Sequence, residues 1–287
     1  MPNSYVSRRS TEAQAFSDWE PPTGTLGELV ASAQARANAL RGRAAELGRA
    51  AAAVTVSTGF RAALVKSKVG IIAEVKRASP SRGSINPGLR ASDQAQSYER
   101  GGAVAISVLT EGTRFGGTNE DLSAARSSVQ IPILRKDFHV DPVQLLEARS
   151  LGASAALVIV RAVPPARLAE LLETARDIGL ETLVEIRNEA ELELSLSLGA
   201  ELIGVNNRDL ETLSVDLSTM DRVLHLIPRS CVAVAESGIV TRAHIERAAS
   251  CGADAVLIGG ALSASDSPEE ALRSLTGVTR VTNARKN

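Results

Sequence analysis

Cysteine is scarce in this chain of 287 residues, which contains only Cys231 and Cys251. Both stand beside the expected start of an apolar strand, where a thiol serves as a small apolar side chain. Two such cysteines make no disulfide framework, so a small secreted scaffold built on disulfides is excluded. A reducing cytoplasm is the expected location.

Long apolar runs and an excess of one charge are also absent. No stretch approaches the roughly 18 apolar residues that a membrane-spanning helix requires, and no apolar segment follows the first residues, so we expect neither secretion nor membrane spanning. Lysine and arginine number 32 against 33 aspartates and glutamates, a net charge of -1. Without a basic field, nucleic acid and membrane surfaces are poor partners, and a small molecule is favoured.

The N-terminal part divides into a polar and a helical segment. Residues 1–23 are polar without an apolar period, which predicts a flexible tail. In residues 24–66, apolar side chains recur every three or four positions, which predicts one amphipathic helix or a pair broken near Gly42. We expect this extension to pack on the main body, with a lid or a dimer face as the alternative. The whole chain is expected to be a monomer or a weak homo-oligomer.

Residues 67–287 contain a repeat of about 50 residues. A Gly-Ala pair precedes an apolar run at four places, which begin at Gly102, Gly152, Gly199 and Gly252. Each glycine suits a helix end and each run suits a buried strand. Four similar runs alternate with these, and helical patterns fill every gap. Strict alternation requires parallel crossovers, so this α/β pattern predicts a single (β/α)8 TIM barrel with an N-terminal helical extension.

An open doubly wound sheet is the alternative architecture, because it also alternates strands and helices. No GxGxxG motif follows the first strand, so the dinucleotide-binding fingerprint of that architecture is missing.

Charged residues gather at the carboxyl ends of the expected strands, where barrel enzymes carry their active sites. Glu74 and Lys76 end the first strand on one face, and their charges are costly to desolvate unless they meet each other or a charged ligand. The following loop, ASPSRG at 78–83, is expected to line the mouth without continuing a strand or a helix. Other strand ends carry further polar residues, namely Lys136, Glu185, Asn206, Arg208 and Glu236.

Small residues follow the last two strands. Ser237, Gly238, Gly259 and Gly260 allow backbone N–H groups to approach an anion, and barrels often hold phosphate there beside a helix N-terminus. This pattern predicts a phosphorylated small-molecule substrate, although turn geometry alone would also explain the glycines.

Six stretches of the chain together resemble one enzyme family. They are IIAEVKRASPSRG, GGAVAISVLTEGTRFGGTNEDL, ILRKDFHVDPVQLLEAR, LVEI, GVNNRDL and AESGI, in order and with consistent spacing from Gly70 to Leu272. The family is that of the indole-3-glycerol-phosphate synthases, carboxy-lyases of tryptophan biosynthesis. The resemblance implies ring closure of 1-(2-carboxyphenylamino)-1-deoxyribulose 5-phosphate with loss of carbon dioxide and water, and it implies no metal and no organic cofactor.

The same resemblance implies roles for single residues. Lys136 would be the general acid at the substrate ketone, and Glu185 and Glu74 would serve the later proton transfers. Lys76 would face the anionic groups of the substrate and donate a further proton. Hydroxyls, carboxylate and aryl ring would be held by Ser79, Phe138, Asn206, Arg208, Leu210, Leu213 and Glu236. A decarboxylating condensation needs an acid at the carbonyl and a base for the later proton, which this set supplies.

Two other functions remain open. The first is a related phosphosugar-barrel isomerase or lyase with a modified aryl or related substrate, which the unusual strand-eight sequence IGGALSAS permits. Small residues in that sequence would leave the phosphate to backbone donors alone. The second is a non-catalytic scaffold, which would be expected to have lost Lys136, Glu185 or Glu74, yet all three are present.

Overall fold

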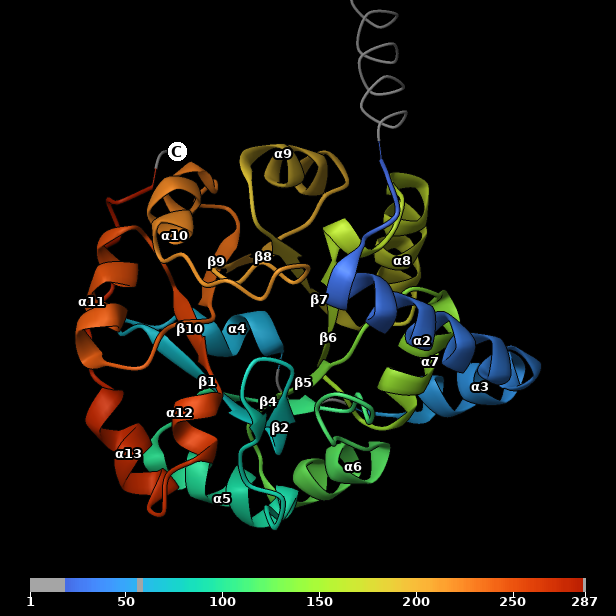
Figure 1. Ribbon diagram of the computed structural model, residues 1–287, viewed down its shortest axis with the longest axis horizontal. Coiled ribbons are helices and arrows are strands. Elements are labelled where there is room, and N and C mark those ends of the chain that lie inside the picture. Colours follow the sequence, from blue (N-terminus) through green and yellow to red (C-terminus); the bar gives the residue numbers. More distant parts are fainter. Residues whose placement is uncertain (1–18, 56–58, 286–287) are drawn as a thin grey trace, which may run out of the picture.

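The computed structural model describes residues 19–55 and 59–285, and its centre is a closed barrel of parallel strands (Figure 1). The strands follow one another round the barrel in the order β1-β10-β9-β8-β7-β6-β5-β4. Their bounds are β1 (Gly70–Val75), β4 (Ala105–Leu109), β5 (Ile133–Lys136), β6 (Ala155–Ile159), β7 (Glu181–Ile186), β8 (Leu202–Asn206), β9 (Val232–Glu236) and β10 (Ala255–Ile258). The predicted (β/α)8 barrel is therefore confirmed.

Burial on both faces explains why these strands are nearly continuous apolar runs. Every residue of β1, β4, β6, β8, β9 and β10 is buried, because one face fills the barrel interior and the other lies under helices. The four repeated glycines have φ between 76° and 99°, the left-handed conformation that ends a helix without a Cβ clash.

In the part of the chain that the structure describes, eight helical segments follow the strands and surround the barrel, as the sequence predicted (Figure 1). They are α5 (Ala91–Gly101), α6 (Asn119–Ser128), α7 (Pro142–Ser150), α8 (Pro165–Asp177), α9 (Glu189–Ser197), α10 (Ser218–Val223) with η3 (Leu224–Leu226), α11 (Arg242–Ser250) and α13 (Pro268–Leu275). Two shorter pieces join them, η2 (Val160–Ala162) and α12 (Gly260–Ser263). Across the described residues, no helix is long and apolar enough to cross a membrane.

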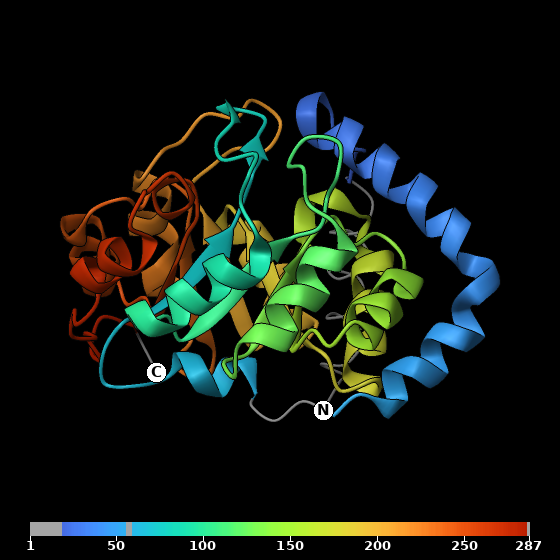
Figure 2. The same ribbon diagram turned by 90° about the horizontal axis from the view of Figure 1, so that it is seen from below.

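The extension is a pair of helices, α2 (Gly24–Leu40) and α3 (Ala44–Ala53), separated by the single turn η1 (Arg41–Arg43). The break lies where Gly42 predicted it. In Figure 2 the chain of α2 starts beside the loops at the barrel mouth, and α3 continues down the outside of the molecule. A short helix, α4 (Phe60–Leu64), precedes β1.

Apolar side chains of α2 join two separate clusters. Leu26, Leu29 and Ala33 are buried in the main core of the barrel, whereas Ala37 packs in a small cluster with Leu47 and Val143. Residues 1–18, which make up most of the predicted flexible tail, lie outside the described residues.

The loop after β1 differs from the expectation in one respect. Its sequence folds into a small antiparallel hairpin of β2 (Ala78–Ser79) and β3 (Gly83–Ser84). Gly83 has φ 65°, which a tight hairpin turn accommodates in glycine without strain. Local turn chemistry therefore gives two short strands where only a loop was predicted.

Candidate active site

A cavity of about 380 Å³ opens among the loops that follow the strands. Small-molecule sites commonly have volumes of about 300–1,000 Å³. The cavity brings together the residues that the sequence singled out: Glu74, Lys76, Ser79, Lys136, Phe138, Glu185, Asn206, Arg208, Leu210, Leu213, Glu236, Ser237, Gly238, Gly259 and Gly260. All of these side chains and glycines therefore share one site.

Lys136 forms the centre of an ionic cluster at the ends of β5, β7 and β9. Its Nζ lies 3.1 Å from Oε2 of Glu185 and 2.5 Å from Oε2 of Glu236. The Nδ2 of Asn206 donates to Oε1 of Glu185 at 2.8 Å, which fixes that carboxylate. Both glutamates are buried, so the ammonium and its partners are held in a fixed geometry with little water around them.

This cluster changes the pKa of its members and so sets their charges. Burial alone would lower the pKa of Lys136, but the carboxylates of Glu236, Glu185 and Glu74 outweigh it and raise that pKa above its usual value. Burial raises the pKa of Glu236 to about 7, against the opposing charge of Lys136. Lys136 is therefore protonated at neutral pH, and Glu236 titrates close to neutrality.

A second ion pair and two aromatic rings line the neighbouring wall. The Nζ of Lys76 lies 3.2 Å from Oε1 of Glu74 and 5.4 Å from the ring centroid of Phe115. The rings of Phe115 and Phe138 lie 6.3 Å apart between centroids. Sequence reasoning missed Phe115, although the chain has only four phenylalanines, which is the one signal that could have drawn attention to it.

The small residues after β9 and β10 also line the cavity. Gly259 cannot carry a side chain while Glu74 keeps its position, because a Cβ there would lie 2.2 Å from Oε1 of Glu74. Ser237 and Gly238 both have positive φ, 63° and 76°, so the backbone turns sharply at this point.

Arg82 is a further residue of this wall that sequence reasoning did not select. It is exposed on the hairpin, and its Nη1 would lie 3.4 Å from a Cβ placed on Gly260. Burial and the positive charge of Arg82 both lower the pKa of Arg208. Two guanidinium groups therefore contribute positive charge to the cavity, and that of Arg82 lies beside Gly260.

Arg208 is held by its own loop. Its Nη1 donates to the carbonyl of Leu213 at 2.6 Å, and its backbone N–H donates to Oδ1 of Asn206 at 2.9 Å. These bonds connect the Asn206 side chain, and through it Glu185, to the loop that carries Leu210 and Leu213.

His139, the histidine nearest the mouth in sequence, lies behind the cavity. It is buried, and its Nδ1 lies 2.7 Å from the carbonyl oxygen of Leu157. Burial and the charge of Arg135 lower its pKa to about 4, so it is neutral at physiological pH. It supports the wall and takes no part in lining the cavity.

Comparisons with known proteins agree with this geometry. A family model described as indole-3-glycerol phosphate synthase matches residues 26–275. Indole-3-glycerol phosphate synthase 2 of Streptomyces coelicolor is 42% identical over 258 residues, which is 89% of this chain and 100% of that protein. Indole-3-glycerol phosphate synthases of Dehalococcoides mccartyi and Mycobacterium ulcerans are 49% and 45% identical, over 69% and 80% of this chain and 78% and 85% of their own lengths.

Similarity to a solved structure supports the barrel fold and carries no information on function. Thiamine phosphate pyrophosphorylase from Pyrococcus furiosus superposes with a TM-score of 0.54 at 14% identity, covering 72% of this chain and 93% of that chain. The family match extends over most of the chain and includes every strand of the barrel. This chain belongs to the indole-3-glycerol phosphate synthase family.

Proposed function

We propose that the cavity closes the indole ring of 1-(2-carboxyphenylamino)-1-deoxyribulose 5-phosphate, with Lys136 as the general acid. The observation that carries the proposal is the position of Lys136, whose ammonium is held protonated between Glu185 and Glu236 inside the cavity. As the ring carbon that bears the carboxylate attacks the ketone carbon, a C–C bond forms and the ketone oxygen takes a proton from Nζ. Loss of carbon dioxide then restores the aromatic ring.

Glu185 and Glu74 are assigned to the dehydration that follows. The new hydroxyl leaves as water after it is protonated, and a carboxylate removes a proton from the methylene beside the nitrogen. Glu185 is fixed by Asn206, and Glu74 by Lys76 at 3.2 Å, so each carboxylate has one oriented partner. Lys76 faces the anionic groups of the substrate and is a second proton donor beside Glu74.

The cavity contains apolar groups that suit the aryl end of the substrate and small or cationic groups that suit its phosphate end. Phe138, Leu210 and Leu213 are assigned to the aryl ring, and Phe115 adds an aromatic face beside them. Ser237, Gly238, Gly259 and Gly260 are assigned to the phosphate, with Arg82 as an additional cation. Ser79, Arg208 and Glu236 remain for the hydroxyls and the carboxylate.

We also propose the organisation and setting of the protein. Within the described residues, the extension occupies the range 24–66 and the barrel begins at residue 67. The protein is proposed to be a monomer or a weak homo-oligomer. Phosphorylated intermediates are highly charged and do not cross bilayers unaided, so an enzyme that consumes one is expected in the cytoplasm.

The direct test is to incubate the purified chain with the carboxyphenylamino substrate, without added metal, and to follow the indole chromophore. Appearance of indole absorbance with equimolar carbon dioxide supports the proposal. The control is the same substrate without its carboxylate, which should give no product. Isomerisation of a related aminodeoxy sugar phosphate without indole formation would instead identify a phosphosugar isomerase.

A further inference from the structure

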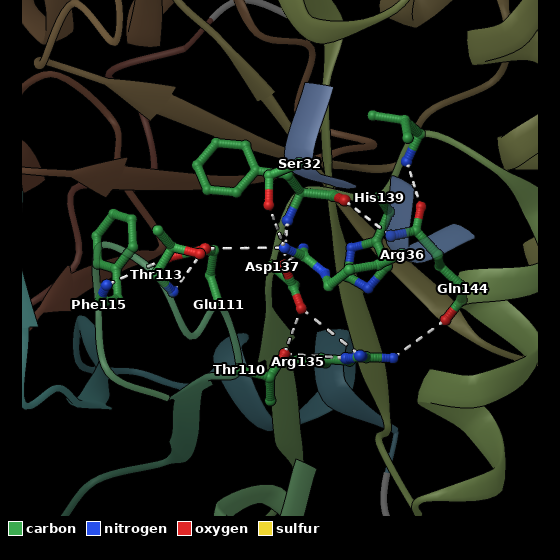
Figure 3. A network of polar contacts seen from close by, with 12 residues as sticks. Ser32, Arg36, Thr110, Glu111, Thr113, Phe115, Arg135, Asp137, His139 and Gln144 are labelled. Carbon is green, nitrogen blue, oxygen red and sulfur yellow. Dashed lines mark hydrogen bonds and ion pairs between the residues drawn. The ribbon is translucent and has the colours of Figure 1, made fainter. Parts of the chain in front are cut away.

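A network of buried charges lies directly behind Lys136 and includes one residue of the N-terminal extension. Arg36 of α2 reaches into the barrel, where its Nη2 donates to Oδ1 of Asp137 at 2.6 Å (Figure 3). Its Nη1 lies 3.7 Å from Oε1 of Glu111. Both carboxylates are almost fully buried, at 2% and 0% exposed, whereas the Arg36 side chain is 35% exposed. A guanidinium at the edge of the barrel thus bridges two buried carboxylates from different loops.

The first carboxylate holds the backbone that directly follows Lys136. Asp137 accepts from the hydroxyl of Thr110 at 2.6 Å and from the backbone N–H of Phe138 at 2.8 Å. The backbone N–H of Thr110 donates in turn to the carbonyl of Lys136 at 3.1 Å. Arg135 belongs to the same network, because its Nε donates to the Thr110 hydroxyl at 3.0 Å (Figure 3). The position of Asp137 therefore affects the peptide that carries Lys136.

The second carboxylate shapes the loop that carries Phe115. Glu111 accepts from the backbone N–H groups of Thr113, Arg114 and Phe115 at 2.9, 2.7 and 3.2 Å. Phe115 is the ring over which Lys76 lies. Among the described residues, Arg36 is the only cationic side chain within ion-pair distance of Glu111. The same guanidinium therefore supports the aryl wall of the cavity and the backbone of Lys136.

We infer that Arg36 is a positioning residue for ring closure, through which the extension holds Lys136 and Phe115 in the reactive geometry. This inference rests on the proposed role of Lys136. Removal of the guanidinium leaves Glu111 without its cationic partner, and it leaves Asp137 with Arg135 alone, whose Nη2 lies 3.5 Å from Oδ2. The loops that carry the two buried carboxylates then lose the group that links them. A displacement of about 1 Å at a reacting group can cost about 100-fold in rate.

Arg41 provides a matched control on the same extension. Its guanidinium binds Asp141 with Nη2 to Oδ2 at 2.8 Å, so it also ties the extension to a barrel aspartate. Asp141 caps α7 and does not line the cavity. Loss of Arg41 therefore weakens docking of the extension without disturbing the residues around Lys136.

The experiment compares kcat, KM and thermal midpoint for the parent, Arg36→Gln, Arg36→Lys and Arg41→Gln. We expect Arg36→Gln to lower kcat by about 10- to 100-fold with KM within about threefold. Arg41→Gln should keep the kcat of the parent, although its thermal midpoint should fall by about as much as that of Arg36→Gln. Arg36→Lys should recover part of kcat, because an ammonium still supplies a positive charge beside Glu111 and Asp137.

Two results would overturn the inference while the parent still forms indole. One is an equal fall of kcat in Arg36→Gln and Arg41→Gln, which would reduce Arg36 to a docking contact. The other is an unchanged kcat in Arg36→Gln, or an Arg36→Lys variant as slow as Arg36→Gln. An inactive parent would count against the proposed function itself, so the two failures are distinguishable.

Discussion

Lys136 and His139 lie three residues apart, yet their surroundings have opposite effects on their charge. Carboxylates surround Lys136 and keep it protonated, which is the state that a general acid requires. Burial and a nearby guanidinium keep His139 neutral. The end of β5 and the loop that follows it thus carry a charged group that faces the cavity and an uncharged group that faces the core.

Acidification should destabilise the protein partly through His139. Its pKa is about 4 in the folded protein against 6.5 for the free side chain, so the unfolded state binds the extra proton between these values. This contribution to stability is present above about pH 6.5 and is lost as the pH falls towards 4, on the order of 2–3 kcal/mol. Urea unfolding of His139→Gln should show a shallower decline over this range than the parent.

The control for this measurement is His225→Gln, because His225 is exposed. That variant should follow the parent curve. If His139→Gln and His225→Gln decline equally steeply with acid, the burial of a neutral histidine is not the source of the acid sensitivity.

Replacement of Arg82 should weaken binding of the phosphate. Charge-assisted hydrogen bonds contribute about 1.5–3 kcal/mol, so Arg82→Gln should raise KM on the order of 10- to 100-fold with a small change in kcat. Inorganic phosphate should inhibit the parent competitively and inhibit this variant less. Arg90→Gln, an exposed arginine outside the cavity, is the control and should bind as the parent does.

Gly260→Asp should raise KM further at the same wall. The new carboxylate would repel a phosphate dianion and would lie close enough to Arg82 to pair with it. The fold should survive, since the change is at the mouth of the barrel and Gly260 has no strained backbone angle. Equal inhibition by phosphate in this variant and the parent would mean that the anion binds elsewhere.

Among the secondary-structure elements, α2 contributes to both stability and the site. Its face of Leu26, Leu29 and Ala33 is part of the main core, and the ion pair of Glu28 with Arg114 ties its start to the loop after β4. The 3.6-residue period of the sequence predicted the helix and its apolar face. It could not predict Arg36 as a partner of Asp137, because the two residues are 101 positions apart and no local pattern connects them.

Leu26→Ala should measure how much docking of α2 stabilises the barrel. Leu26 is 1% exposed, and large-to-small changes at such positions cost about 2–5 kcal/mol. We expect a loss in this range from urea unfolding. Leu226→Ala, at a position 42% exposed, should change stability by about 0.5 kcal/mol or less. Similar losses in both variants would mean that α2 contributes little to the core.

At the scale of the whole molecule, the barrel and most of the residues at its mouth could be predicted from the sequence. The residues that end each strand can be read directly from the sequence, and in a parallel barrel these ends meet at one mouth. Alternating strands and helices determine the topology, and the topology gathers Glu74, Lys136 and Glu185 from distant strands into one cavity. Phe115 and Arg82 were not predictable in this way, since both lie on loops whose paths depend on tertiary contacts. The role of Arg36 was unpredictable for the same reason, because its partners Asp137 and Glu111 lie on loops that only the tertiary structure brings to it (Figure 3).

The proposed donation of a proton from Lys136 during ring closure is tested most directly by the turnover number of Lys136→Met. Methionine keeps most of the length of the side chain and removes the ammonium between Glu185 and Glu236. With the carboxyphenylamino substrate, kcat should fall on the order of 10²- to 10⁴-fold while KM stays within a few fold. A Lys136→Met variant that forms indole at close to the parent rate would contradict the account.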